Sequence, residues 1–200
     1  MDTIYVISGC MRSFTSMMMS CMEAGGMDCV YAEATEEMPD ACGLHEMSVA
    51  QRRELFRDPQ AFSGKCIKML CHYGYLPLPK WEGRYKVILM LRDPSEIMES
   101  YEKLFGKPMC YEDFPDASDL QKKLSVPFSA ELYGQIIRAT IQDAAERGDI
   151  NFLILDGRAI IENPPERFKQ IADFWPIDAA KAAAIVDKAK VHCGNEVAAT

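Results

Sequence analysis

The sequence lacks the features that define several large classes of protein. It has no apolar run long enough to span a membrane, and its start, where the first apolar stretch ends at Ile7, does not predict a signal peptide. It has 22 Lys and Arg against 30 Asp and Glu, a net charge of −8, so it has no overall basic character for nucleic acid. We therefore expect a cytoplasmic protein that binds neither membrane nor nucleic acid.

Closely spaced pairs of cysteines are also missing from the sequence. The eight cysteines are spread singly and none forms C-x-x-C, so the sequence has neither zinc-ligand spacing nor a redox motif. We expect reduced, mostly buried thiols and no metal. Histidine is scarce as well, and this leaves few acid–base candidates. The three histidines are His45, His72 and His192.

Length and patterning indicate one α/β domain over residues 1–200. A hydrophobic fraction of 48% and a charged fraction of 26% are ordinary for a globular chain of this size. Apolar runs that alternate with helical patterns predict buried strands. These runs are Ile4–Ile7, Ile67–Leu70, Val87–Leu91 and Phe152–Leu155. The alternation predicts a three-layer, doubly wound parallel sheet.

The segment Ile4–Gly26 is the most informative part of the chain. It predicts a short strand, a tight loop that Gly9 opens, and a helix that begins within residues 13–16. The N–H groups of the first helical turn and the helix dipole would make this loop an anion site. A guanidinium and three hydroxyls suit phosphate or sulfate oxygens. They come from Arg12, Ser13, Thr15 and Ser16.

The loop fits the nucleoside-triphosphate template GxxxxGK[ST] poorly. Gly9 and Ser16 take the ends of the pattern, but Phe14 falls on the second glycine and Thr15 falls on the lysine. A phenylalanine at positive φ is strained, so its ring must find a place elsewhere. The missing lysine, together with the lack of an obvious Mg²⁺-binding aspartate pair, disfavours a nucleotide kinase or another phosphoryl transferase.

A second ligand-facing element is predicted within residues 85–106. A buried strand ends at Leu91, and Pro94 fits the first turn of the helix that follows. Arg92 would then stand at the carboxyl end of a strand, where ligands bind in open α/β sheets. Ser100 lies about two helical turns further along, at a spacing of 3.6 residues per turn.

These segments resemble the motifs of sulfotransferases, in particular the small bacterial and phage-type members. The run GCMRSFTS is similar to the family loop, roughly G-x-P-[KR]-S-G-T-[ST], with Met11 and Phe14 in place of proline and glycine. Residues 92–100 match the family pattern R-[ND]-P-x-x-x-x-x-S in register. Residues 151–177 and 181–187 resemble the family's closing strand and helices. The longer G-x-x-G-D-W-K signature of the cytosolic animal enzymes is absent.

The resemblance implies a P-loop nucleoside-triphosphate-hydrolase-like (sulfotransferase) fold. It implies transfer of a sulfonate from 3′-phosphoadenosine-5′-phosphosulfate to a hydroxyl or amine of a small-molecule or peptide acceptor, which leaves adenosine 3′,5′-bisphosphate. It also implies that Arg92 and Ser100 bind the 3′-phosphate. The loop residues implied in donor binding are Gly9, Arg12, Ser13, Phe14, Thr15 and Ser16.

Sulfonate transfer needs positive groups and a base that takes the acceptor's proton. Arg12 and Lys68 are the expected positive groups. In many family members a strand ends K-T-H and its histidine is the base. Here Lys68 is in register, Leu70 takes the histidine's place, and His72 follows two positions later. The candidate bases are His72, His45 and Glu33. A non-catalytic protein that binds a nucleotide or a partner on the same fold stays an alternative.

Overall fold

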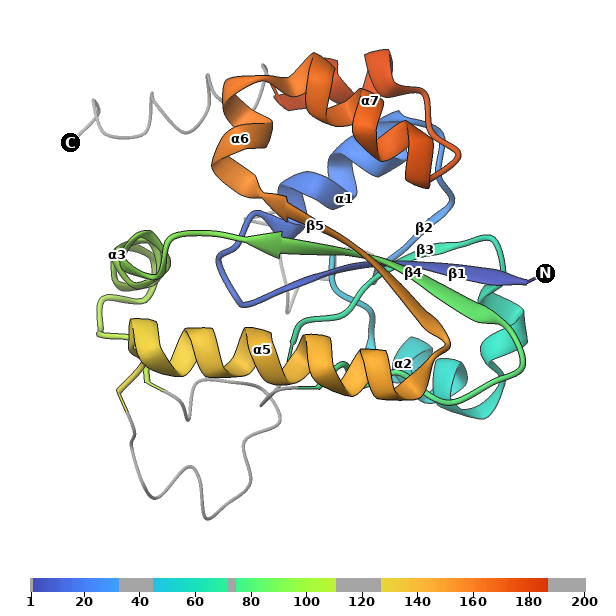
Figure 1. Cartoon of the computed structure of the whole chain (residues 1–200), viewed down its shortest axis with the longest axis horizontal. Helices are drawn as coiled ribbons and strands as arrows, with labels where there is room; N and C mark the ends of the chain where they lie inside the picture. Colours follow the sequence, from blue (N-terminus) through green and yellow to red (C-terminus); the bar gives the residue numbers. More distant parts are fainter. Residues whose placement is uncertain (1, 33–44, 72–74, 111–126, 187–200) are drawn as a thin grey trace.

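The chain is built around a five-stranded, all-parallel sheet with the strand order β2-β3-β1-β4-β5 (Figure 1). The computed structural model describes residues 2–32, 45–71, 75–110 and 127–186. The strands are β1 (Thr3–Gly9), β2 (Cys29–Val30), β3 (Cys66–Lys68), β4 (Arg84–Leu91) and β5 (Ile150–Asp156). β1 is the central strand and pairs with β3 on one side and β4 on the other. The predicted parallel α/β sheet is confirmed.

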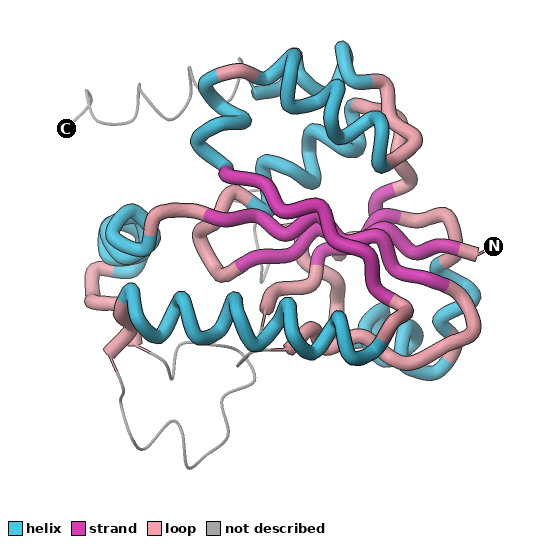
Figure 2. Tube along the Cα trace, in the orientation of Figure 1, coloured by secondary structure: helices cyan, strands magenta, loops and turns pink. Residues whose placement is uncertain are grey.

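Helices cover both faces of the sheet, an arrangement compatible with a three-layer α/β fold. Figures 1 and 2 show α1, α6 and α7 on one face and α2 and α5 on the other. The helices are α1 (Thr15–Ala24), α2 (Val49–Arg57), η1 (Pro59–Phe62, a 3₁₀ helix), α3 (Pro94–Phe105), α5 (Ala130–Arg147), α6 (Gly157–Glu162) and α7 (Pro164–Phe174). Residues 179–186 are helical as well.

Side-chain alternation along the strands divides the core into two clusters. In β1, Ile4 and Val6 join the cluster on one face, while Ile7 joins the cluster on the other. Both clusters are buried, because a parallel sheet with helices on both faces covers both sides of its strands. Methionines of α1 fill the second cluster, and Met18 and Met22 are fully buried.

The helix boundaries follow the predicted start and stop signals. α3 begins with Pro94 in its first turn, and α5 ends at Gly148, which adopts φ 73°. Two expectations need correction. β3 ends at Lys68, before the predicted Leu70. The N–H groups of Met69 and Cys71 nevertheless donate to the β1 carbonyls of Ile7 and Gly9. No helix was predicted directly after β5, where the structure has the short helix α6.

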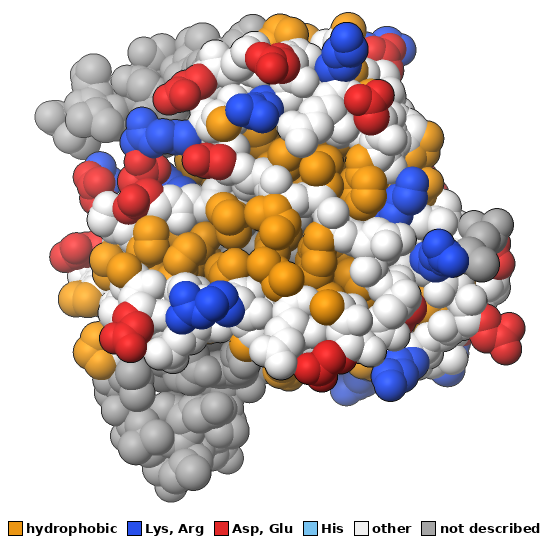
Figure 3. Space-filling view, in the orientation of Figure 1, with side chains coloured by type: hydrophobic (Ala, Val, Ile, Leu, Met, Phe, Trp, Pro, Cys, Tyr) orange, Lys and Arg blue, Asp and Glu red, His pale blue; other side chains and the backbone are white. Residues whose placement is uncertain are grey.

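The edge strand β5 leaves apolar side chains at the surface. β5 pairs only with β4 in the strand order, and Ile154 is 43% exposed. Figure 3 shows hydrophobic side chains gathered along the middle of this face of the molecule. Despite that apolar band, the described part of the chain contains no helix with the length and hydropathy needed to cross a bilayer.

We expect Phe168→Ala to lower the free energy of unfolding by about 3–5 kcal/mol, the usual cost of emptying a buried aromatic site. Phe168 is fully buried in the cluster beneath α7. Phe56→Ala is the matched control, because that ring is 55% exposed and its loss should cost much less. Urea unfolding followed by circular dichroism measures both changes. Equal losses would show that the α7 side of the sheet is not packed as described.

Candidate anion-binding site

The predicted site residues meet at the carboxyl edge of the three central strands. Gly9 ends β1, Lys68 ends β3, and Arg92 directly follows β4. Because β1 lies between β3 and β4, the loop that leaves β1 is flanked by both neighbours. This edge is where open α/β sheets form their ligand crevice.

The first turn of α1 begins without a side-chain cap. The N-cap residue is Phe14, which makes no capping hydrogen bond. Four other helices, α2, α3, α5 and α6, begin with a side chain that accepts a backbone N–H. Those caps are Ser48, Asp93, Ser129 and Asp156. The uncapped end of α1 therefore presents backbone donors and the positive end of its dipole to an anion.

The loop backbone adopts left-handed conformations at two non-glycine residues. Arg12 has φ 67° and Phe14 has φ 65°, while Ser13 between them is not left-handed. Such alternation turns successive N–H groups toward one concave side and favours anion binding. Gly9 is required because of close contacts: a Cβ there would lie 2.4 Å from Ser13 Oγ and 2.6 Å from the Met90 carbonyl oxygen.

The Phe14 ring packs against the Arg92 guanidinium. The Arg92 Cζ lies 4.2 Å from the ring centroid, a cation–π geometry. The ring also lies against Gly157, where an added Cβ would be only 2.3 Å from Phe14 Cδ2. The ring therefore turns onto neighbouring groups, as expected, and the left-handed backbone costs about 1–3 kcal/mol.

The buried ammonium of Lys68 lies at the start of α1. Its Nζ donates to Ser16 Oγ at 3.1 Å and forms an ion pair with Glu46 Oε1 at 3.3 Å. Burial lowers the pKa of Lys68, and the Glu46 carboxylate opposes this by raising it. A cation thus reaches Ser16 from β3, although the loop itself lacks the lysine of nucleoside-triphosphate P-loops.

Ser100 lies at the Arg12 guanidinium, and the binding of a phosphate by Arg92 and Ser100 stays a prediction. Ser100 Oγ accepts hydrogen bonds from Arg12 Nε at 3.1 Å and Arg12 Nη2 at 3.0 Å, and not from Arg92. Arg92 Nη1 donates instead to the Arg12 carbonyl oxygen at 2.8 Å. The two anion sites expected from the sequence, one in the loop and one at Arg92, are therefore one continuous cluster.

Two of the expected loop hydroxyls are buried. Ser13 is fully buried, and its Oγ donates to the Cys10 carbonyl oxygen at 2.6 Å. This hydroxyl closes the loop in the structure, and its part in binding a ligand stays a prediction. Thr15 is 4% exposed. The backbone N–H groups and the Ser16 hydroxyl are therefore better placed than these side chains to meet an anion.

His45 is the candidate base that the structure describes. Its Nε2 lies 3.4 Å from Ser20 Oγ, one helical turn beyond Ser16 in α1, and its ring packs edge-on against Tyr31 with 4.9 Å between centroids. It directly precedes Glu46, so it lies on the Lys68 side of the loop. The other two candidates, His72 and Glu33, lie outside the described residues.

The described cysteines are mostly buried free thiols, as expected. Cys10, Cys21, Cys66 and Cys71 are buried, and Cys29 and Cys110 are partly buried. Burial raises the pKa of the Cys10 thiol, so this loop residue is not a ready nucleophile. Within the described ranges, no three His, Cys, Asp or Glu side chains come together as a metal-binding group.

Four residues of the cluster were not anticipated from the sequence. Glu46 neutralises Lys68, Glu96 accepts from Arg92 Nε at 3.2 Å, and the Tyr133 hydroxyl accepts from the Arg92 N–H. Gly157 makes room for the Phe14 ring. All four lie at least 30 positions after the loop, and no motif in the sequence pointed to them. Only the spacing of Glu96, four residues after Arg92, carried a signal.

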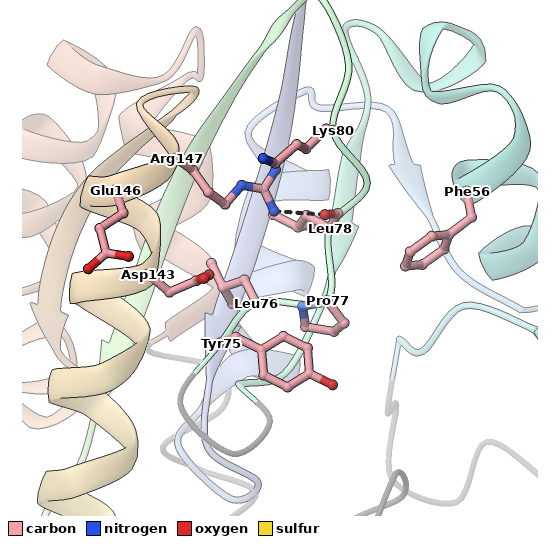
Figure 4. Close-up of a pocket in the computed structure, with 9 residues that line it drawn as sticks. All are labelled: Phe56, Tyr75, Leu76, Pro77, Leu78, Lys80, Asp143, Glu146 and Arg147. Carbon is pink, nitrogen blue, oxygen red and sulfur yellow. Dashed lines mark hydrogen bonds between the residues drawn. The ribbon is translucent and has the colours of Figure 1, made fainter.

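A separate pocket of about 660 Å³ lies between the last turns of α2 and α5 and residues 75–80 (Figure 4). Its lining includes Phe56, Tyr75 and Asp143 and none of the predicted site residues. Arg147 enters it from α5, but its guanidinium binds the Leu78 carbonyl oxygen at 2.7 Å and pairs with Asp149. This arginine therefore anchors the segment and does not form a second anion site.

No family model matches this sequence, and no curated protein matches it. The chemistry of the site therefore has to be inferred from its own residues. Those residues provide the uncapped start of α1, one buried ammonium and two guanidinium groups within a single connected cluster.

We expect Glu46→Gln to lower the pKa of Lys68 further below its ordinary value of 10.5, since the carboxylate raises it against burial. The folded protein would then release this proton at lower pH than the unfolded chain. The free energy of unfolding would therefore rise with pH over a wider window below 10.5 than in the unmodified protein.

NMR titration of lysine side chains, with Lys68→Met to assign the signal, measures this pKa directly. Glu54→Gln is the matched control, because Glu54 pairs with the exposed Arg57 and should leave Lys68 unchanged. A Lys68 pKa that does not move in Glu46→Gln would show that the ion pair contributes nothing at the site.

Proposed function

We propose that this protein is a sulfotransferase with a P-loop-like fold, which moves a sulfonate from 3′-phosphoadenosine-5′-phosphosulfate to a hydroxyl or amine acceptor. The observation that carries the proposal is the uncapped, glycine-opened start of α1 with the Lys68 ammonium held at Ser16. The motif resemblance of the loop and of residues 92–100 supports the choice of a sulfonate donor over other anionic ligands.

The donor has two phosphorylated ends, and the cluster offers two groups of donors. The first group is the α1 N-terminus with Lys68, which suits the 5′-phosphosulfate. The second group is the Arg12 guanidinium with Ser100 on α3. A ligand phosphorylated at both ends matches this arrangement better than a single short anion does.

The roles of the chain's own residues follow from this arrangement. The N–H groups of α1 would hold the leaving phosphate, and Lys68 would offset negative charge as it develops there. When bound, the donor supplies the sulfonate. His45, close to Ser20 on the flank of α1, is the described residue best placed to accept the acceptor's proton. Its backbone φ of 50° fixes an unusual direction for that side chain.

A phosphoryl transferase is the competing function, because Lys68 restores the cation that the loop lacks. Such an enzyme would also need carboxylates to hold Mg²⁺ near the phosphates. Among the described residues, Glu46 is a carboxylate at this end of α1, and it is paired with Lys68 and also with Arg52 at 3.2 Å. Binding Mg²⁺ there would require breaking both pairs, so ATP is the disfavoured ligand.

We expect adenosine 3′,5′-bisphosphate to bind at least tenfold more tightly than ATP, a difference of about 1.4 kcal/mol or more. The reason is the pair of donor groups, which a linear triphosphate cannot engage at both ends. Isothermal titration calorimetry with each nucleotide, with and without Mg²⁺, measures the difference. Equal affinities, or ATP binding that depends on Mg²⁺, would favour the phosphoryl transferase.

We expect His45→Gln to reduce sulfonate transfer by about 10²–10⁴-fold, the usual contribution of a positioned base. Binding of adenosine 3′,5′-bisphosphate should change little, since His45 contacts Ser20 rather than the first turn of α1. Transfer of ³⁵S-sulfonate to a panel of phenols, alcohols and amines provides the assay. His72→Gln is the parallel variant, and loss of activity in it alone would assign the base to His72.

A further inference from the structure

β5 presents backbone N–H and C=O groups along its outer edge. The Tyr85 N–H of β4 donates to the Asp149 carbonyl oxygen at 2.9 Å. In a parallel ladder, alternate residues direct their backbone groups to the same neighbour, so Leu153 also faces β4. The backbone groups of Phe152 and Ile154 therefore point away from β4. Of the residues that the structure describes, none forms a strand beyond β5.

The sequence of β5 lacks the features that usually protect an edge strand. Natural sheets protect their edges with very short strands, prolines or charged side chains. β5 is seven residues long, and residues 150–155 include neither a proline nor a charged residue. In the common view of Figures 1 and 3, β5 crosses the face on which hydrophobic side chains gather. Such an edge is a template for pairing with another strand.

The charges around β5 favour a second copy of this chain as the partner. Each copy has a net charge of −8, so two copies can approach closely only through a face without excess negative charge. Just before β5, Asp149 pairs with Arg147 at 2.8 Å. At the other end, Asp156 caps α6 beside Arg158, which pairs with Glu96. Between these two ends the strand is uncharged, so this face suits contact between two acidic chains.

A two-fold axis at Leu153 makes β5 complementary to itself. Antiparallel pairing about this axis opposes Phe152 of one copy with Ile154 of the other. Both residues direct their backbone groups outward, so the two can exchange N–H···O=C bonds. Phe152 packs against the cluster on the α5 face, and Ile154 shares that face by alternation, so the opposed side chains also meet. The opposite edge strand, β2, is only two residues long and offers no comparable ladder.

We propose that the protein forms a two-fold symmetric dimer in which the β5 strands of two copies pair antiparallel and join their sheets into one continuous sheet. The assembly closes at two copies, because each copy contributes the same edge and no equivalent edge remains. The carboxyl edges of the two sheets then point in opposite directions, so the dimer leaves both candidate anion sites uncovered. The proposal does not depend on the proposed function.

The mass of the full chain in solution tests the proposal. We expect sedimentation velocity over a range of concentrations to give the mass of two copies. Ile154→Lys should weaken the dimer by about a hundredfold or more, because the change enters a two-fold interface twice. Val49→Lys is the matched control, because that valine is 66% exposed on α2 rather than at the sheet edge. A monomer, an open-ended series of larger assemblies, or a dimer that Ile154→Lys leaves unchanged would overturn the proposal.

A pair of opposite charges tests whether the two β5 strands meet each other. In the proposed register, Ile154 of one copy lies diagonal to Ile154 of the other, at about 7–8 Å, within reach of long side chains. Ile154→Lys and Ile154→Glu should each be monomeric alone, because each places like charges across the axis. An equal mixture should recover a dimer, because one copy then brings an ammonium to the carboxylate of the other. A mixture that stays monomeric would contradict pairing through β5.

Backbone hydrogen exchange tests the pairing in the unmodified protein, so it does not depend on how well a variant folds. The Leu153 N–H faces β4 in either state and should exchange slowly. In the dimer, the N–H groups of Phe152 and Ile154 should exchange as slowly as that of Leu153, and their protection should fall on dilution. NMR spectroscopy resolves the three positions. Fast exchange at Phe152 and Ile154 beside a protected Leu153 in concentrated protein would show a free edge and overturn the proposal.

Discussion

The candidate site depends on one constraint, the turn by which the chain leaves β1 and enters α1. Gly9 is pressed so closely against Ser13 and the Met90 carbonyl that no larger residue fits. Left-handed backbone at Arg12 and Phe14 then directs the loop toward α1. This turn leaves the helix without a side-chain cap and points its first turn at the carboxyl edge of the sheet. Every charged group of the site is arranged around that edge.

The charges of the site are matched locally, although the chain as a whole carries a net charge of −8. Lys68 is buried beside Glu46, and Arg92 is held beside Glu96. A buried cation is tolerated only with such a partner, because removing it from water is costly. The charges of Lys68 and Arg92 are therefore balanced by nearby carboxylates at this edge of the sheet. Local donors, rather than the net charge of the chain, decide whether such an edge favours an anion.

Much of the fold could be predicted from the sequence because its signals are local. The apolar runs marked four of the five strands. Pro94 marked the start of α3, and Gly148 marked the end of α5. The two-residue strand β2 and the short helix α6 were not predicted, because segments this short have no measurable periodicity. Of the site, the loop and Arg92 were predicted as two anion sites, each at the carboxyl end of a strand. The pairing of Lys68 with Glu46 and the stacking of Arg92 on Phe14 were not predicted, because contacts between distant segments leave no spacing in the sequence.

The sequence by itself determined the parallel α/β sheet, the glycine-opened loop and the set of polar residues at its carboxyl edge. Backbone propensity and hydrophobic periodicity are properties of neighbouring residues, so they can be read along the chain. Only the tertiary structure decided that Ser100 accepts from Arg12, that Ser13 turns inward, and that the Phe14 ring lies between Arg92 and Gly157. Those choices depend on packing and hydrogen bonding between residues far apart in the sequence, such as Arg12 and Ser100 at a separation of 88, or on competition for the same atoms. Such choices are fixed only when the sheet brings all of the competing groups to one edge.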